Sequence, residues 1–542
     1  MTAIGTPRSD QLFLGLDSST QSLKAIAIDG TLRVTAEYTV SFDEDLPEYE
    51  TKGGVHIAPD GLRVTSPPLM WVAALDLLLA RMQADNFAFA DVAALSGSGQ
   101  QHGSVYLNRT ARSRLQALDP EQPLRDQLGD CFALDASPIW MDSSTTAQCR
   151  ALEAALGGAQ RVADLTGSRA YERFTGNQIA KIYQDNPAAY EASDRIALVS
   201  SFMASLLLGG YAPIDTADGS GMNLMDIRRK DWVPAALDQT APDLAARLGA
   251  VSPAHAVAGP IAGYFAKRYA FDPACRLVTF SGDNPNSLAG LLLRRAGDIA
   301  VSLGTSDTMF GALRAPSPSP DEGHIFVNPV DPEGYMAMVV HKNGSLTREQ
   351  ALGRHKIGSW PAFEKLLAQT PPGNNGNIGF YFTDPEITPP THAGGTFRFD
   401  RADAQAADFP AETDVRALIE SQFLSLRLHG EHIGLEPGML LATGGASENM
   451  AILSVLANVF GVPVYRGDQK NSAALGAAYR ALHGWVCEQS AAFVPFADAL
   501  GNAPAFSLAA EPDTQAHAAY NKMLDRYARL EKQAVELANR DA

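Results

Sequence analysis

The sequence predicts an α/β protein built from two structurally similar halves. Two stretches share one pattern, in which a buried strand, a hydroxyl-rich turn and a second strand follow one another; they begin at residues 12 and 298. Residues 439–464 read as a strand, a Gly-Gly turn, a helix and a short second strand, which is an α/β unit. Because each half opens with the same kind of hairpin, we expect a weak internal duplication, with a domain boundary near residues 290–298.

The composition is that of an ordinary globular protein. At roughly 150 residues per domain, 542 residues predict two large domains or three to four average ones. The net charge is −18 and no run of lysine and arginine stands out, so we expect no nucleic-acid partner. Four widely spaced cysteines without a CxxC motif, and the lack of an 18-residue apolar run, predict a cytoplasmic protein with reduced thiols and no membrane partner.

The first domain is expected at residues 11–295, after a disordered leader at residues 1–10. Its hairpin has two apolar strands, and a later segment has apolar residues every three or four positions, which predicts a helix. Two buried strands run directly into polar loops. These elements are the strands 12–16 and 23–28, the helix 69–83, the strand 92–95 with its loop 96–103, and the strand 277–280 with its loop 281–285.

The second domain is expected at residues 296–542 and repeats the hairpin. Near the C-terminus, Tyr520, Tyr527 and Leu530 share one helical face, which predicts that this helix packs on the body of the protein. The predicted elements are the strand 298–303, the turn 304–308, the strand 439–443, the turn 444–445, and the helices 447–460, 471–483 and 515–539.

The two hydroxyl-rich turns are candidate phosphate sites. Small residues let backbone N–H groups approach a phosphate, and serine and threonine hydroxyls add donors. Asp17 would repel a phosphate, so its natural role is to hold Mg²⁺. For either turn alone, a surface turn whose side chains bond to their own backbone is an equally simple interpretation. Two such turns, one in each half, favour a nucleotide phosphate tail.

The Gly444-Gly445 turn is a third candidate. It suits close approach of a ligand to the end of a strand, although a tight strand-to-helix turn explains it as well. The chain has neither GxGxxG nor GxxxxGK[ST] at these turns, so neither a dinucleotide-binding fold nor a P-loop is supported.

Asp283 is the strongest single candidate for catalysis. It follows a buried strand near the domain boundary, where a carboxylate can accept a proton from a substrate hydroxyl. The alternative is that Asp283 or Asn284 caps a helix. The Gln100–His102 loop offers several polar groups, which is what a polyhydroxylated ligand needs, whereas a lone histidine is usually structural. Arg173 is by default a solvated charge.

Five motifs, in this order along the chain, resemble those of the FGGY carbohydrate kinases over about residues 12–490. They are Gly15–Ser22, Gln100–Gly103, Gly282–Asn284, Ser302–Ser306 and Gly444–Asn449. The resemblance implies two actin-like (ribonuclease H-like) ATPase domains of the sugar kinase/actin/heat-shock-protein superfamily, with an interdomain cleft. It also implies transfer of the γ-phosphate of ATP to a sugar or polyol hydroxyl.

The resemblance assigns roles residue by residue. Asp17 would hold Mg²⁺, and Asp283 would be the catalytic base. The positions implied to bind ATP are Ser18, Ser19, Thr20, Gly304, Thr305, Trp360, Gly444, Gly445 and Asn449, and those implied to bind the sugar are Gln101, His102, Arg173, Asp283 and Asn284.

Further motifs resemble the longer, animal-type branch of the family, which phosphorylates D-xylulose at its C5 hydroxyl. They include Trp140–Cys149, Asp218–Asn223 and Lys342–Ser345. The expected partners are therefore a small sugar and ATP, in a monomer or homodimer. Three alternatives remain: a kinase for another ketose or pentitol, a sugar-binding pseudokinase, and an actin-like ATPase that acts on proteins.

Overall fold

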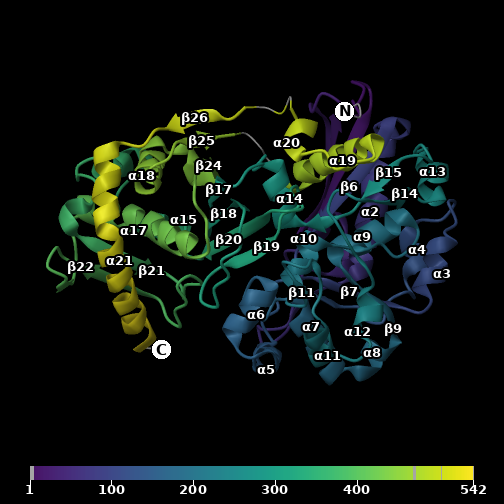
Figure 1. The fold of residues 1–542 in the computed structure, drawn as a ribbon, viewed down its shortest axis with the longest axis horizontal. Coiled ribbons are helices and arrows are strands. Elements are labelled where there is room, and N and C mark those ends of the chain that lie inside the picture. Colours follow the sequence, from purple (N-terminus) through teal and green to yellow (C-terminus); the bar gives the residue numbers. More distant parts are fainter. Residues whose placement is uncertain (1–4, 468–470, 502, 504, 541–542) are drawn as a thin grey trace. The chain divides into compact units, whose positions relative to one another are not determined.

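The computed structural model describes residues 5–467, 471–501, 503 and 505–540. The chain folds into two compact units (Figure 1). The first comprises Met1–Arg294, Phe326–Tyr335 and Gln469–Ala503, and the second comprises Arg295–Ile325, Met336–Asp468 and Pro504–Ala542. The first division between the units lies between Arg294 and Arg295, and two later segments of the chain belong to the first unit.

The expected leader falls partly outside the described residues, since residues 1–4 are not described. Residues 5–10 form no helix or strand, yet they contact other parts of the first unit. The Gly5 N–H donates to Ser490 Oγ at 3.1 Å, and the Arg8 N–H donates to Gln11 Oε1 at 2.8 Å.

The sheet of the first unit positions the first group of candidate residues. Within the described residues, its strands follow the order β14-β15-β6-β1-β2-β3, and β16 also pairs with β6. β1 pairs antiparallel with β2 and parallel with β6, and β6 pairs parallel with β16. The carboxyl ends of β1, β6 and β16 therefore meet at one edge. The strands are β1 (Leu12–Ser18), β2 (Ser22–Asp29), β3 (Val34–Ser41), β6 (Val92–Gly99), β14 (Val257–Pro260), β15 (Arg276–Val278) and β16 (Ser281–Gly282).

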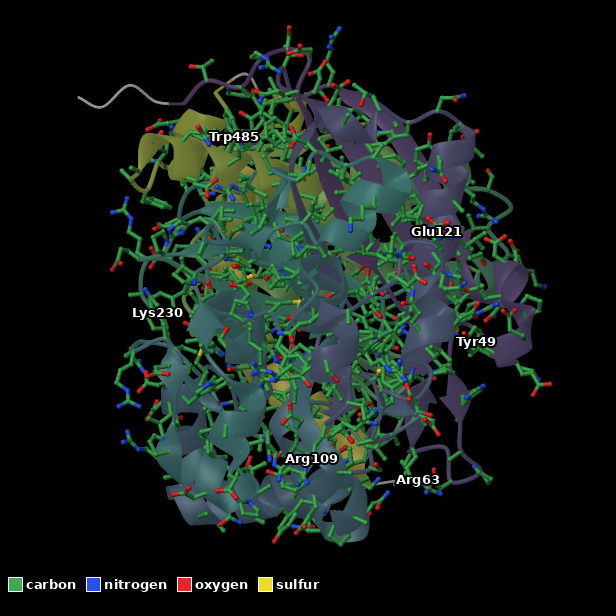
Figure 2. The ribbon with its side chains drawn as sticks, turned by 90° about the vertical axis from the view of Figure 1, so that its right-hand side faces the viewer. Tyr49, Arg63, Arg109, Glu121, Lys230 and Trp485 are labelled. Atoms are coloured by element: carbon green, nitrogen blue, oxygen red, sulfur yellow. The ribbon has the colours of Figure 1, made fainter. Side chains whose placement is uncertain are left out.

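Helix α19 (Ser472–Ser490) belongs to the first unit, although the sequence places it in the second domain. It packs so closely on β1 that a Cβ on Gly15 would lie 2.1 Å from the Ala474 carbonyl oxygen. Figure 2 labels Trp485 on α19, whose ring packs edge-on against Phe13 of β1 with centroids 5.8 Å apart. This close packing is possible because glycine has no side chain to separate the two backbones.

The remaining elements of the first unit surround this sheet with helices and short strands. The helix expected at 69–83 is α2, which buries Trp71, Leu75 and Leu78. The elements are α1 (Phe42–Asp45), β4 (His56–Ile57), β5 (Val64–Ser66), α2 (Pro68–Ala84), β7 (Ser104–Asn108), α3 (Ala111–Gln116), α4 (Leu124–Leu128), β8 (Ser137–Pro138), α5 (Thr146–Leu156), α6 (Ala159–Thr166), α7 (Thr175–Asp185), α8 (Pro187–Ala192), β9 (Ser193–Leu198), α9 (Val199–Leu208), β10 (Ile214–Asp215), α10 (Thr216–Gly219), β11 (Met225–Asp226), β12 (Asp231–Trp232), α11 (Pro234–Thr240), α12 (Leu244–Leu248), β13 (Val251–Ser252), α13 (Gly263–Tyr269), α14 (Asp283–Gly290) and α20 (Phe496–Ala499).

The second sheet repeats the central arrangement of the first. In the described chain its strand order is β19-β20-β18-β17-β24-β25-β26. β17 pairs antiparallel with β18 and parallel with β24, as β1 does with β2 and β6, so the predicted duplication is visible in the pairing. The strands are β17 (Asp298–Leu303), β18 (Asp307–Leu313), β19 (His324–Val327), β20 (Tyr335–His341), β24 (Met439–Thr443), β25 (Val464–Arg466) and β26 (Ser507–Ala510).

Long helices accompany the second sheet. The C-terminal helix α21 packs through the expected face, because Tyr520 and Tyr527 are buried and donate hydrogen bonds to Glu420 and Ser421 of α17. The helix expected at 447–460 begins instead as the 3-10 turn η5 and continues as α18. The elements are α15 (Ser345–Arg354), α16 (Trp360–Leu367), β21 (Ile378–Phe382), β22 (Gly395–Phe399), β23 (Gln405–Ala406), α17 (Ala411–His432), η5 (Gly445–Glu448), α18 (Met450–Phe460) and α21 (Thr514–Arg540). None of the helices that the structure describes has the length and apolar character needed to cross a membrane.

Candidate active site

Asp17 lies at the carboxyl end of β1, next to Ser98 of β6. The Ser98 hydroxyl donates to Asp17 Oδ1 at 2.5 Å, and Lys24 faces Asp17 from β2. Burial raises the pKa of the Asp17 carboxyl, and the Ser98 hydrogen bond and the Lys24 charge offset part of this rise. Among the described residues, Oδ2 of Asp17 accepts no hydrogen bond. One carboxylate oxygen is therefore available to a cation.

The turn after Asp17 combines both interpretations that the sequence allowed. Ser19 bonds to its own turn, since its N–H and hydroxyl donate to the Ser22 carbonyl at 3.0 and 2.9 Å. The Thr20 hydroxyl accepts a hydrogen bond from Trp140 Nε1 at 2.9 Å. Ser18 differs, because its hydroxyl is buried and has no hydrogen-bond partner in the described chain. Ser18 is thus the one hydroxyl of the three predicted phosphate contacts that is buried without a partner.

Asp283 is the first residue of α14 and directly follows β16. Its Oδ1 accepts the Asn284 N–H at 2.8 Å and the Gln101 N–H at 3.4 Å. The carboxylate therefore also accepts one of the backbone N–H groups in the first turn of α14. Burial raises the pKa of Asp283 to about 7, and the nearby negative charge of Asp17 adds to this shift. A carboxylate with a pKa near 7 can gain or release a proton near neutrality, which suits a general base.

Gln101 connects Asp283 and Asn284 to a carboxylate that the sequence analysis did not single out. Gln101 Oε1 accepts from Asn284 Nδ2 at 2.8 Å, while its Nε2 donates to Asp218 Oδ1 at 3.5 Å. Asp218 also accepts the Ser200 hydroxyl at 2.5 Å, and burial raises its pKa to about 7. In the sequence, Asp218 begins the motif Asp218–Asn223, but this motif says nothing about proximity to Gln101.

His102 is held in an orientation that defines its chemistry. Its backbone has φ +68°, its ring stacks on Phe174 with centroids 4.3 Å apart, and its Nδ1 lies 2.9 Å from the Gly221 carbonyl oxygen. Burial lowers the pKa of His102 to about 3, with a further contribution from the Arg173 charge, so the ring is neutral at pH 7. Because a carbonyl only accepts, Nδ1 carries the proton and Nε2 is an acceptor for a hydroxyl.

Arg173 belongs to the same unit and is partly buried, contrary to the default of a solvated charge. Its guanidinium carbon lies 5.8 Å from the centre of the Tyr171 ring, and within the described chain no carboxylate pairs with it. Burial lowers its pKa, because the charged form loses contact with water. The first unit thus brings Asp17, Gln101, Asp283 and Asn284 together at strand ends, with His102 on the same loop as Gln101.

The second unit has a cavity of about 620 Å³ at the ends of β17 and β24. Of the residues predicted to bind ATP, five line it: Gly304, Thr305, Trp360, Gly445 and Asn449. The turn 304–306 is held by Arg348, which forms a buried double hydrogen bond with Asp307 at 2.7 and 2.9 Å. Asn449 has a second role, because its Oδ1 accepts the Ile452 N–H at 3.1 Å and caps α18.

The two adjacent glycines of this turn have different surroundings. A Cβ on Gly445 would meet no atom within 4 Å, so the space beside it belongs to the cavity. Gly444 does not line the cavity; it has φ +81°, and a Cβ there would lie 2.7 Å from the Leu303 carbonyl oxygen. Gly444 therefore serves the close packing of the turn on β17, and its predicted contact with ATP remains a prediction.

Comparison with known proteins identifies the family. Residues 133–290 match the N-terminal domain and residues 299–485 the C-terminal domain of the FGGY family of carbohydrate kinases. Xylulose kinase of Mus musculus is 53% identical over 547 residues, covering 99% of this chain and 98% of that protein. Xylulose kinase 2 of Arabidopsis thaliana is 50% identical over 503 residues, covering 90% of each.

Solved structures show the same fold at low sequence identity. Xylulose kinase from Rhodospirillum rubrum has a TM-score of 0.79 at 16% identity, with 97% of this chain and 100% of that chain covered. Glycerol kinase from Plasmodium falciparum with ADP has a TM-score of 0.73 at 15% identity, with 95% and 98% covered. These similarities confirm the predicted α/β fold, which this chain shares with solved carbohydrate kinases. The chain belongs to the FGGY family of carbohydrate kinases.

Proposed function

We propose that this carbohydrate kinase transfers the γ-phosphate of ATP to the C5 hydroxyl of D-xylulose, giving D-xylulose 5-phosphate. The substrate is that named for relatives 50–53% identical over 90% or more of the chain. The observation that carries the chemistry is Asp283, a carboxylate whose pKa lies at about 7 beside the polar loop of Gln101 and His102.

In the proposed reaction, the C5 hydroxyl oxygen attacks the γ-phosphorus as its proton passes to Asp283. The new O–P bond forms while the bond to the departing ADP oxygen breaks, without a phosphorylated enzyme. His102 Nε2 accepts one sugar hydroxyl and Arg173 donates to another. Asn284 would accept a third through its Oδ1, because its Nδ2 already donates to Gln101 and Asp283. Most of the rate then comes from positioning and from electrostatic stabilisation of the transferred group.

Nucleotide and metal contacts are part of the proposal. The cavity of the second unit would take the adenosine beside Trp360, Gly445 and Asn449, and the two hairpin turns would contact phosphates. Asp17 Oδ2 and the Ser18 hydroxyl have no partner among the described residues, and these oxygens fit a hard cation such as Mg²⁺. When bound, Mg²⁺ would offset the negative charge of the ATP phosphates. The location is proposed to be cytoplasmic, which the four buried, unpaired cysteines support.

The test is a sugar panel read through ADP release, combined with one substitution. D-xylulose should give the highest kcat/KM, ahead of D-ribulose and xylitol, and ATP turnover should depend on sugar. Asp283→Asn should lower kcat by about 10²–10⁴-fold with both KM values nearly unchanged, because the amide cannot take the proton.

Asp231→Asn is the matched control, since Asp231 is exposed and also accepts the N–H of the next residue at 2.8 Å. It should retain full activity. An Asp283→Asn enzyme within about tenfold of the unaltered one, below the general-base range, would overturn the assignment of the base. Sugar-independent ATP hydrolysis would instead favour an actin-like ATPase, and no turnover of any sugar would favour a pseudokinase.

A further inference from the structure

Three potential metal ligands converge in the second unit, in a place that the kinase reaction does not use. Glu322 lies in the connection between β18 and β19, and His429 and His432 lie one helical turn apart at the end of α17. Glu322 Oε1 is 3.0 Å from His429 Nδ1 and 2.6 Å from His432 Nδ1. The three ligand atoms all lie within 4.8 Å of one another.

The surrounding groups orient two of these ligands. The second ring nitrogen of His429, Nε2, is 3.0 Å from Glu531 Oε2 on α21, and the Ser425 hydroxyl donates to the other Glu531 oxygen at 2.8 Å. The Ser319 hydroxyl donates to Glu322 Oε2 at 2.7 Å. A histidine whose outer nitrogen donates to a carboxylate is the usual arrangement behind a metal ligand, because the carboxylate fixes the ring and leaves the inner nitrogen free to coordinate.

We propose that Glu322, His429 and His432 bind a divalent transition-metal ion of the Zn²⁺ type, with Glu531 as a positioning residue. Two imidazole nitrogens and one carboxylate oxygen suit Zn²⁺, whereas Mg²⁺ and Ca²⁺ prefer oxygen ligands throughout. The His432 side chain is 51% exposed, so the ion can enter from solvent and water can complete its coordination. Coordination at about 2.0–2.2 Å requires the Glu322–histidine contacts to widen slightly, which the exposed His432 side chain permits.

Bound metal would link parts of the second unit that are far apart in sequence. It would join the β18–β19 connection to α17, and Glu531 extends the link to α21. The site is therefore expected to stabilise the second unit and to be independent of the proposed sugar phosphorylation. Without metal, the same groups form a Glu322–His429–Glu531 ion-pair network, which is the competing explanation that the experiment addresses.

The experiment is a Zn²⁺ titration of the full chain after removal of metal with EDTA, followed by calorimetry. The unaltered protein should bind one Zn²⁺ per chain, and Co²⁺ should give a visible absorption band typical of a low-coordinate site. His432→Asn and Glu322→Gln should each weaken binding at least tenfold. Glu531→Gln should weaken it by about 10–100-fold, as expected for a group that orients a ligand.

His392→Asn is the control for surface histidines, since His392 is exposed and lies in the same unit. It should bind Zn²⁺ like the unaltered protein. His432→Asn replaces a half-exposed side chain, so circular dichroism should show an unchanged fold and its loss of binding can be attributed to the site. The proposal is overturned if the unaltered protein binds no Zn²⁺ and shows no Co²⁺ band, or if His432→Asn binds Zn²⁺ with unchanged affinity.

Discussion

At the scale of single residues, two buried groups have protonation states that suit opposite roles. Asp283 holds a proton up to about pH 7 because burial and the Asp17 charge disfavour its ionised form. His102 stays neutral far below pH 7 because burial and the Arg173 charge disfavour its protonated form. In the proposed reaction, the first can take a proton and the second can only accept a hydrogen bond.

The pKa of Asp283 predicts an acidic limb in the pH profile of the enzyme. The base acts only when deprotonated, and its raised pKa means that protonation begins near neutrality. We therefore expect kcat/KM for the sugar to fall about tenfold per pH unit below about pH 7 and to level off above it. Initial rates between about pH 5 and about pH 8.5, at saturating ATP, measure this limb. A profile that is level down to about pH 5 would contradict it, because an ordinary aspartate titrates near pH 4.

His102→Asn should weaken use of the sugar without affecting ATP. Asparagine tolerates the left-handed backbone at this position, where φ is +68°, but it does not reproduce the ring acceptor Nε2. An unpaired sugar hydroxyl costs about 1–3 kcal/mol, so kcat/KM for the sugar should fall by about ten- to a hundredfold. Steady-state kinetics with each substrate varied in turn provide the measurement. Loss of ATP affinity with unchanged sugar kinetics would show that His102 belongs to a different site.

At the scale of elements, the two hairpins and the β24–η5 turn carry the candidate ligand contacts. Both sheets place a turn at the end of a central strand that also has a parallel neighbour, so the turn lies at the carboxyl edge of the sheet. In the β24–η5 turn, the two adjacent glycines have different structural roles. Gly444 allows the chain to pass close to β17, and Gly445 leaves room beside the cavity.

This division predicts different effects for substitutions at adjacent positions. Gly445→Val should fold normally, because its Cβ would meet no protein atom within 4 Å. Its side chain would instead occupy the cavity and raise the ATP KM about tenfold or more, which corresponds to ~1.4 kcal/mol of lost binding free energy. Gly444→Ala should instead lower thermal stability, because its Cβ would meet the Leu303 carbonyl and its φ is +81°. Kinetics and thermal unfolding of both variants distinguish the roles. Unchanged ATP kinetics in a folded Gly445→Val enzyme would place the nucleotide elsewhere.

At the scale of the whole molecule, a late segment of the chain belongs to the first unit. This segment is Gln469–Ala503, and it follows most of the second unit in the sequence. Helix α19 lies more than 450 residues after β1 in the sequence, yet it covers β1 and α14. A Cβ on Gly476 would lie 1.8 Å from the Asn286 carbonyl oxygen, which shows how closely α19 approaches α14. The first unit is therefore incomplete without residues from the end of the chain.

A chain that ends at residue 295 should fail to fold stably. It would expose the surfaces that Tyr479, Leu482 and Val486 of α19 bury, and each large apolar side chain contributes about 1.5–3 kcal/mol. Losing several of them removes much of a typical stability of about 5–15 kcal/mol. Size-exclusion chromatography should show aggregation, and a flexible linker to residues 469–503 should restore a soluble species. A monomeric, cooperatively unfolding fragment 1–295 would contradict this expectation.

The sequence by itself determined the features that depend on local patterns. Apolar runs on either side of hydroxyl-rich turns predicted the hairpins, and apolar residues every three or four positions predicted α2 and the packed face of α21, because such patterns reflect which side chains of one element face the core. Ordered motifs identified the family and, through it, the residues of the candidate site. The alternative prediction that Asp283 or Asn284 caps a helix differs from the structure, because Gly282 is the N-cap of α14 and no side chain caps it; Asp283 is the first helical residue, and its Oδ1 accepts the Asn284 N–H.

Only the tertiary structure decided which distant residues meet. The Gln101 N–H reaches Asp283 across 182 residues, Asp218 reaches the same glutamine across 117, and Glu322 meets His429 across 107. The same holds for α19, whose apolar pattern predicts a buried helix without saying which sheet buries it. The reason is physical: local spacing records how an element faces the core, whereas strand order, close backbone approach and packing together determine which elements share that core.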